Sequence, residues 1–240
     1  MSKGFRDTLV NGLKEWNILC DERQLEQFVR YHSLVVEKNR EFNLTSITEE
    51  TESAVKHFLD SLSLLLFARP EPGTRVMDVG TGAGFPGIVL KIAVPSMNLT
   101  LLDSSRKKVA FLEEALAVLE LDRAVAVWGR AEVLARQVRY REQYDWVLAR
   151  AVAEIRVLAE YCLPLTAVGG VFVAYKGPGA EAELAGAETA LDLLGGNVEA
   201  VLKLSLPFGG GERNLVMIRK VKPTPERFPR RPGMPEKRPL

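Results

Sequence analysis

From Gly73 onward, short apolar runs alternate with segments of helical periodicity, and no other feature constrains the fold of this chain as strongly. Parallel strands cannot be joined by a tight turn and usually need a helical crossover, so this alternation predicts a parallel sheet covered by helices on both faces. The predicted parallel strands are residues 75–79, 99–103, 125–128, 146–149 and 171–175.

Two more predicted strands, residues 201–206 and 214–221, flank a turn that contains Gly209, Gly210 and Gly211. The gap between them is too short for a helix, so we expect an antiparallel hairpin. Five parallel strands ending in such a hairpin resemble the Rossmann-like class I methyltransferase fold. We therefore predict an α/β fold with a mostly parallel sheet, an antiparallel C-terminal hairpin and a small helical N-terminal region.

Residues 1–72 are predicted to be helical. Apolar residues recur there at spacings of three and four, from Leu25 to Val36 and again from Ala54 to Leu66. The second helix is expected to begin with Thr48 as its capping residue. The proline-rich stretch at 70–73 predicts a linker, which divides the chain into a helical region (1–72), a catalytic domain (73–222) and a tail (223–240).

The tail is basic and rich in proline. Between positions 219 and 240, eight Lys or Arg residues face two Glu, a net charge of +6, although the whole chain carries only +1. Because proline removes a backbone donor and fixes its own backbone angle, we expect an extended arm rather than a helix or central strand. Its cations predict contact with nucleic acid phosphates, and a solvated terminus is the alternative. The candidate RNA-binding residues here are Arg227, Arg230 and Arg231.

Cys20 and Cys162 are the only cysteines, and they form neither a disulfide framework nor a metal-ligand spacing. Neither an apolar leader nor a run of about 20 apolar residues that could span a bilayer is visible. We therefore expect a cytoplasmic protein without a metal site and without a membrane partner.

The loop that follows the first predicted strand contains Gly80, Gly82 and Gly84, with Asp78 two residues upstream of the first glycine. Glycines at such a position let the backbone turn sharply and approach a ligand closely. A dinucleotide fingerprint would have glycine where Phe85 stands, so the pattern is the tighter GxGxG form. This form resembles the cofactor loop of methyltransferases.

Three further strand ends carry candidate ligand contacts. Asp103 lies 23 positions after Gly80, where a carboxylate can accept hydrogen bonds from both ribose hydroxyls of an adenosine, although it could instead cap the following helix. After the third strand, a backbone N–H of Ala131 or Glu132 could contact adenine, or Glu132 could merely begin the next helix. Arg150 ends the fourth strand, beside the point where strand order should reverse.

Arg150 is therefore the residue most expected to face the reacting centre, where a forked guanidinium suits the methionine carboxylate or an RNA phosphate. Lys176 ends the fifth strand and could serve the same anionic surface, or remain solvated.

Motifs that the sequence lacks narrow the chemistry. The chain has no Pro-Pro pair, which amino-group methylation of adenine or cytosine would use, and Cys162 lies in an apolar run typical of a buried thiol rather than a nucleophile. A ring nitrogen such as guanine N7 has a free lone pair and loses no proton, so no catalytic base is required and positioning supplies most of the rate. His32 and His57 lie on apolar stripes and are expected to be structural.

Taken together, these segments resemble the bacterial 16S rRNA guanine-N7 methyltransferases of the RsmG, or glucose-inhibited division protein B, family. The resemblance covers nearly the whole chain and rests on residues 41–45, 57–62, 78–87, 102–104, 130–132, 150–151, 176–177 and 228–233.

The resemblance implies methyl transfer from S-adenosylmethionine to N7 of a guanine in the 530 loop of small-subunit rRNA. It also implies a cofactor site, to which the glycine loop adds Gly82. The candidate cofactor-binding residues are Gly80, Gly82, Phe85, Asp103, Ser104, Ser105, Ala131, Glu132 and Arg150. The role of the motifs around Asn43 and His57 does not follow from the sequence, beyond packing the helical part against the cofactor domain.

The expected partner is 16S rRNA or the small ribosomal subunit, bound by a monomer. Two alternatives remain at this point. A methyltransferase for a small molecule or protein would keep its activity without residues 223–240, and a nucleotide-sensing regulator would bind S-adenosylmethionine without transferring its methyl group.

Overall fold

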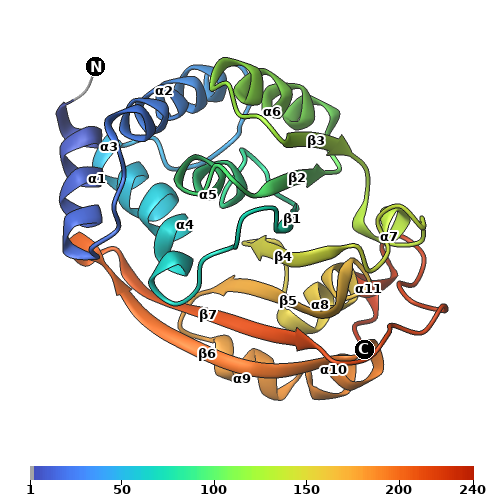
Figure 1. The fold of residues 1–240 in the computed structure, drawn as a ribbon. Coiled ribbons are helices and arrows are strands. Elements are labelled where there is room, and N and C mark those ends of the chain that lie inside the picture. The colour runs from blue at the N-terminus through green and yellow to red at the C-terminus, as the bar shows by residue number, and fades with distance from the viewer. Residues whose placement is uncertain (1–2) are drawn as a thin grey trace.

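Seven strands form one sheet in the order β3-β2-β1-β4-β5-β7-β6 in the computed structural model, which describes residues 3–240 (Figure 1). The strands are β1 (Arg75–Val79), β2 (Asn98–Asp103), β3 (Ala124–Trp128), β4 (Tyr144–Arg150), β5 (Thr166–Lys176), β6 (Gly196–Leu206) and β7 (Gly211–Lys220). Strands β1 to β5 pair in parallel, and β7 pairs antiparallel with both β5 and β6. The predicted fold class is confirmed.

Strand order reverses at β1, which pairs with β2 on one side and β4 on the other. Asp78 of β1 is in register with Leu101 of β2 and Leu148 of β4. The chain therefore continues to opposite sides of β1, toward β2 on one side and β4 on the other. In open α/β sheets, ligands bind in the crevice at the carboxyl ends of the strands at such a point. The sequence placed Arg150 beside this point, and Arg150 is the last residue of β4.

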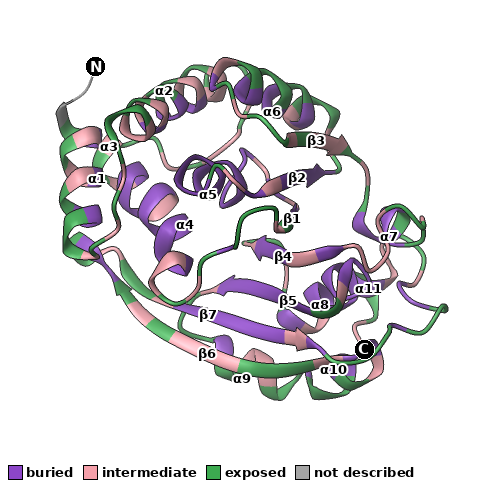
Figure 2. Cartoon of the chain, in the orientation of Figure 1, coloured by how far each residue is buried: buried purple, intermediate pink, exposed green. Residues whose placement is uncertain are grey.

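Helices cover both faces of the sheet (Figure 1). One face is packed by α1 (Lys3–Glu15), α2 (Glu22–Asn39), α3 (Glu50–Ser53), α4 (Asp60–Leu62), α5 (Gly87–Ala93) and α6 (Arg106–Val118). The other is packed by α7 (Ala131–Leu134), α8 (Ile155–Cys162), α9 (Ala180–Ala185) and α10 (Glu188–Leu194). Figure 2 shows the central strands β4, β5 and β7 largely buried, whereas the edge strand β6 is largely exposed. In residues 3–240 no helix has the length and apolar character needed to cross a membrane.

The helix predicted to start at Thr48 differs from the expectation. Glu49 is its capping residue, because the Glu49 carboxylate accepts hydrogen bonds from the backbone N–H of Thr51 and Glu52. The helix then changes form, from α3 through a π-helical segment, Ala54–Leu59, to α4 and a 3-10 turn, Ser63–Leu66. A wider turn of this kind is often found at functional sites.

The C-terminal segment, residues 223–240, is not the extended arm that its prolines predicted. It folds back on the sheet face that carries α7 and α8, and Phe228 is buried. The guanidinium of Arg141 donates hydrogen bonds to the carbonyls of Thr224 and Phe228. Because the prolines of this segment lack N–H groups, its backbone carbonyls find donors in side chains instead. A one-turn helix, α11 (Met234–Lys237), also forms, with Pro235 in its first turn, where proline is tolerated.

Candidate active site at the carboxyl ends of the strands

The glycine loop turns sharply over the end of β1. The N–H groups of Gly80 and Thr81 both donate to the carbonyl of Leu102, and Gly80 and Gly82 have φ of +68° and +62°. A Cβ added at Gly82 would meet nothing within 4 Å, whereas one at Gly80 would lie 2.8 Å from a methyl group of Val152. The loop therefore leaves open space at Gly82, where a ligand can approach the backbone.

Asp78 is fully buried beneath this loop. Its Oδ2 accepts hydrogen bonds from the Thr81 hydroxyl, at 2.6 Å, and from the Gly87 N–H, at 2.8 Å. Its Oδ1 has no partner among residues 3–240, and burial raises the pKa of the carboxyl to about 6. An unpaired buried carboxylate oxygen is costly, so this atom suits a cationic group of a ligand, such as an ammonium.

Asp103 ends β2 and holds the same loop. One carboxylate oxygen accepts from the Gly82 N–H, at 3.0 Å, and the other from the Ser105 N–H, at 2.8 Å. The capping position of α6 is occupied by Ser105, so Asp103 is not the helix cap that the sequence left open as its alternative role. Since each carboxylate oxygen can accept two hydrogen bonds, Asp103 keeps capacity for a ligand's hydroxyl groups.

A cavity of about 270 Å³ lies over these strand ends. It brings together five of the predicted cofactor-binding residues, which are Gly80, Asp103, Ser104, Ala131 and Glu132. Gly82 and Ser105 contribute through the backbone bonds that hold Asp103. Glu132 lies in the first turn of α7 and is buried, and its Oε1 accepts a hydrogen bond from Gly233 at 2.9 Å.

Arg150 faces a second cavity, of about 380 Å³. Its guanidinium donates to Asp60 Oδ2, at 3.1 Å, and Arg213 donates to the other oxygen of Asp60, also at 3.1 Å. Lys176 lies in the same cavity, where it pairs with Glu183 at 2.7 Å. We call Lys56, Arg150, Lys176 and Arg213 the cation cluster. Against Asp60, Glu183 and Glu52, which pairs with Lys56 at 2.6 Å, the cluster keeps an excess of one positive charge, which attracts phosphate.

The two cavities meet at one turn of the chain. Ala151 lines the cavity of the cation cluster, and the next residue, Val152, lines the cavity above Asp103. Ala151 has a φ of +55°, a left-handed conformation that is uncommon for a residue with a side chain. Neighbouring residues of one turn therefore line the two cavities.

Phe85 is part of an aromatic cluster rather than of either cavity wall. The imidazole of His57 stacks on Phe85 at 4.5 Å between centroids, and Phe58 and Tyr31 pack against the same ring. His57 also bonds to the Thr45 hydroxyl, at 2.7 Å. Burial and the nearby Arg150 charge lower the pKa of His57 to about 3, so the ring is neutral. The structure confirms that the His57 motif packs the helical part against the cofactor loop.

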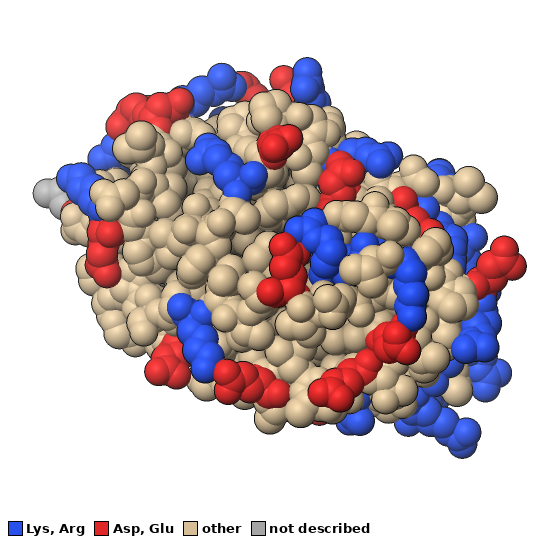
Figure 3. Space-filling model, turned by 60° about the horizontal axis from the view of Figure 1, so that its bottom comes forward, with Lys and Arg blue, Asp and Glu red and all other residues tan. Residues whose placement is uncertain are grey.

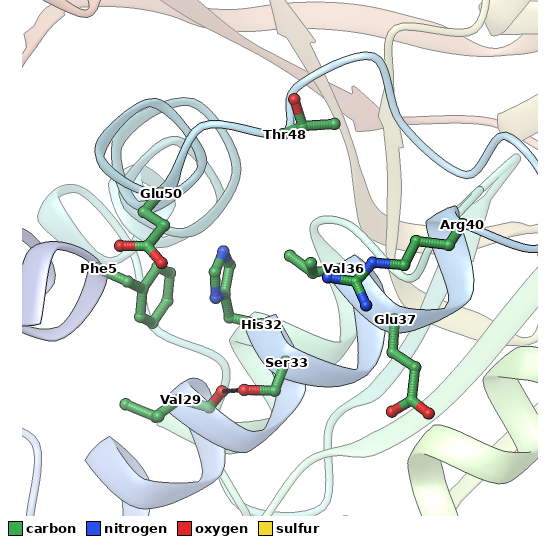
Figure 4. Close-up of a pocket in the computed structure, with 9 residues that line it drawn as sticks. All are labelled: Phe5, Val29, His32, Ser33, Val36, Glu37, Arg40, Thr48 and Glu50. Atoms are coloured by element: carbon green, nitrogen blue, oxygen red, sulfur yellow. Dashed lines mark hydrogen bonds between the residues drawn. The ribbon is translucent and has the colours of Figure 1, made fainter. Parts of the chain in front are cut away.

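A third cavity, of about 400 Å³, lies away from the strand ends, beside α2 and α3 (Figure 4). His32 is directed into it, stacked on Phe5 at 4.1 Å, and its Nε2 has no partner in the described chain. Glu50 and Arg40 also line this cavity. Within residues 3–240, no cluster of His, Cys, Asp and Glu could hold a metal ion.

Both cysteines are free thiols. Burial raises the pKa of Cys162 well above its usual value, so this thiol is not an activated nucleophile.

Positive charge gathers on one side of the molecule. Figure 3 shows Lys and Arg concentrated at the right of the view, the side on which the C-terminal segment and α7 lie in Figure 1. The exposed basic residues there include Arg136 and Arg139, in the turns that follow α7, and Arg227, Arg231, Lys237 and Arg238 of the C-terminal segment. Arg230 differs, because its guanidinium is held by the buried carboxylate of Glu160 at 2.6 Å.

Sequence reasoning missed several residues of these cavities, among them Lys56 and Arg213 of the cation cluster. Tyr161 and Glu236 line the cavity above Asp103, and Asp60 joins two arginines of the cation cluster. Asp60 falls within the motif at 57–62, but no local pattern reveals its partners, which are 90 and 153 positions away. Glu236 lies in a segment that composition alone described as an arm.

A protein-family model and two relatives that match this chain carry the same description. The protein-family model described as rRNA small subunit methyltransferase G (GidB) matches residues 24–216. The ribosomal RNA small subunit methyltransferase G of Pelotomaculum thermopropionicum is 53% identical over 234 residues, 98% of each chain. That of Symbiobacterium thermophilum is 49% identical over 241 residues, again 98% of each chain. Among solved structures, a SAM dependent methyltransferase from Aquifex aeolicus aligns with a TM-score of 0.51 at 19% identity, over 69% of this chain and 92% of that one.

Proposed function

Because this chain belongs to the rRNA small subunit methyltransferase G family, and is therefore an S-adenosylmethionine-dependent methyltransferase of small-subunit rRNA, we propose how its two cavities divide the reaction. The cavity above Asp103 holds the cofactor, and the cavity of the cation cluster receives a guanine of the 530 loop of 16S rRNA, whose N7 takes the methyl group. The observation that carries this proposal is the 53% identity to a methyltransferase of small-subunit rRNA over 98% of both chains.

The residues of the first cavity fit S-adenosylmethionine. Asp103 accepts hydrogen bonds from the ribose hydroxyls, and the backbone at Ala131 and Glu132 contacts adenine. Open space at Gly82 admits the chain of the ligand, and the unpaired Oδ1 of Asp78 suits its ammonium group. The cofactor supplies an electrophilic methyl group on a sulfonium.

The chain contributes positioning rather than proton transfer. Guanine N7 attacks with its own lone pair, so no residue has to remove a proton, and the neutral His57 is not required as a base. Arg150 and Lys176 orient the nucleotide by contacts to its phosphates, and Arg227 and Arg231 extend this contact to the neighbouring RNA. Arg230 would have to leave Glu160 to take part.

The organisation of the chain follows from these roles. Residues 73–222 carry the cofactor site, residues 1–72 support the loop through Phe85, and residues 223–240 present basic side chains. Both cavities are formed within one chain, which is consistent with a monomer. We expect an enzyme that acts on small-subunit ribosomal RNA to work in the cytoplasm, where its substrate is assembled.

The test is methylation of small-subunit rRNA in vitro. Purified protein is incubated with S-adenosylmethionine and either 30S subunits or extracted 16S rRNA from cells that lack the enzyme, and nucleosides are mapped by mass spectrometry. We expect one 7-methylguanosine in the 530 loop. Methylation elsewhere on the guanine, or of another base, would overturn the assignment of N7.

A second experiment tests whether the basic surface binds RNA. The paired substitution Arg227→Gln with Arg231→Gln should weaken rRNA binding and flatten its salt dependence by about two phosphate contacts, while leaving affinity for S-adenosylmethionine unchanged. These substitutions are preferable to removing residues 223–240, since that segment is part of the folded core through Phe228. An unchanged salt dependence would exclude this surface as the RNA-binding face.

A further inference from the structure

The C-terminal segment forms part of the wall of the cavity above Asp103. Glu236, in α11, lines this cavity together with Tyr161, in α8. The Tyr161 hydroxyl donates to Glu236 Oε1, at 3.1 Å. Burial, with the carboxylates of Glu132 and Glu236 nearby, raises the pKa of Tyr161 above its usual value, so this hydroxyl stays protonated and remains a donor.

Two anchors fix the backbone that carries Glu236. Arg230 binds the carboxylate of Glu160 through its side chain and its backbone N–H, and the Glu160 side chain is only 1% exposed. Three residues later, the Gly233 N–H donates to Glu132, itself a wall of the cavity. The position of Glu236 is therefore set by contacts to buried acids, not by the end of a free tail.

The free oxygen of Glu236 is an acceptor without a donor. In residues 3–240 no hydrogen bond or ion pair reaches its Oε2. Glu132 is differently placed, because it is buried and its Oε1 is taken by Gly233. Glu236 is exposed at the cavity, so its Oε2 is an accessible acceptor on the wall formed by α8 and α11.

Adenine supplies the complementary group. Of its polar atoms away from the ribose, only the exocyclic 6-amino group donates hydrogen bonds, and the ring nitrogens accept. With the ribose at Asp103, the base extends toward the loop after β3 and the wall formed by α8 and α11. A carboxylate there accepts from the 6-amino group and disfavours purines that present an acceptor in its place.

We propose that Glu236 is a further cofactor-binding residue, which accepts a hydrogen bond from the 6-amino group of adenine and so makes the C-terminal segment part of the cofactor site. This inference rests on the proposed placement of S-adenosylmethionine in the same cavity. Tyr161 is a positioning residue, since it acts by orienting the Glu236 carboxylate.

The test compares two ligands by calorimetry with the full-length protein: S-adenosylhomocysteine and its analogue with hydrogen in place of the 6-amino group. The wild-type protein should bind the analogue about tenfold more weakly, as expected for one lost hydrogen bond to a charged group. In Glu236→Ala this ratio should fall below about twofold, by the logic of a double-mutant cycle. Tyr161→Phe should reduce the ratio partially.

Glu226→Gln is the matched control, because Glu226 lies in the same segment, is exposed and forms no side-chain hydrogen bond or ion pair within residues 3–240. It should leave both affinities unchanged. If Glu236→Ala weakens the two ligands equally, so that the ratio stays near the wild-type value, Glu236 is only structural and the inference is wrong. If the wild-type protein binds neither ligand, the proposed cofactor site fails instead, and the two failures are thereby distinguished.

Discussion

Replacing Asp103 with alanine tests the cofactor site most directly. The carboxylate is held by the N–H groups of Gly82 and Ser105, at 3.0 and 2.8 Å, which directs its remaining lone pairs toward the cavity. Each hydrogen bond from a ribose hydroxyl to this charged acceptor contributes about 1.5 kcal/mol, so losing two should cost about 3 kcal/mol of binding free energy. The dissociation constant for S-adenosylmethionine should then rise roughly 100-fold.

Titration calorimetry measures this change, and thermal melting checks that the variant folds. Asp122→Ala serves as the control, since Asp122 is an exposed acid just before β3, at the opposite end of the parallel strands and outside the cavity. A 2′-deoxyribose analogue of S-adenosylhomocysteine adds a second check. It should bind the wild-type protein about tenfold more weakly than the parent compound, and Asp103→Ala should weaken it by only about tenfold further, against about 100-fold for the parent compound, because only the 3′-hydroxyl bond is left to lose. A folded variant with less than a threefold change in affinity would refute the placement of the ribose.

Three other substitutions probe the supporting structure. Phe85→Ala should lower the free energy of unfolding by about 3–5 kcal/mol in urea titrations, because it empties the centre of the ring cluster formed with His57, Phe58 and Tyr31; a loss below 1 kcal/mol would contradict that packing. The pKa of His57 is about 3 in the folded chain and 6.5 when unfolded, so the unfolded state takes up the proton first and wild-type stability falls as pH drops from 6.5 toward 3. His57→Gln should lose about 2 kcal/mol less than the wild type between pH 7 and 4.5, and parallel pH profiles would disprove this. Arg230→Ala should destabilise the fold by about 3 kcal/mol, since it leaves the Glu160 carboxylate buried and unpaired, whereas Arg231→Ala should change stability by less than about 0.5 kcal/mol in the same denaturation assay.

The sheet and its ligand-binding edge could be predicted because their signals are local. The strand at 75–79 was predicted with the bounds that β1 has, and the hairpin pairing of β6 with β7 was also correct. An apolar run that ends in glycines specifies a strand, a turn and a close backbone approach within a dozen residues. The position of the Asp103 carboxylate could be predicted for a similar reason, since the carboxyl ends of parallel strands lie at the same edge of the sheet.

The C-terminal segment could not be predicted, because its structure depends on distant partners. Proline content indicates which backbone donors are missing, but not that Arg141 and Glu160 will satisfy the segment from 70 to 87 positions away. The π-helical segment has the same origin. The apolar spacing from Ala54 to Leu66 is compatible with one α-helix, and the wider turn at Ala54–Leu59 is where His57 stacks on Phe85, a contact that periodicity does not encode.

Under the proposed division of the two cavities, the turn at 150–152 accounts for how the substrate is aligned without a catalytic base. Arg150 faces the cation cluster and Val152 faces the cofactor loop, with a methyl group at 2.8 Å from where a Cβ of Gly80 would stand. A side chain at Gly80 would therefore require Val152 to shift, in the turn that connects it through the left-handed Ala151 to Arg150. Attack by N7 requires alignment with the bond to the leaving sulfur, and misplacement by about 1 Å can cost two orders of magnitude in rate. If cofactor and base bind as proposed, Gly80 serves both cavities, because the loop at one cavity packs against the turn that leads to the other.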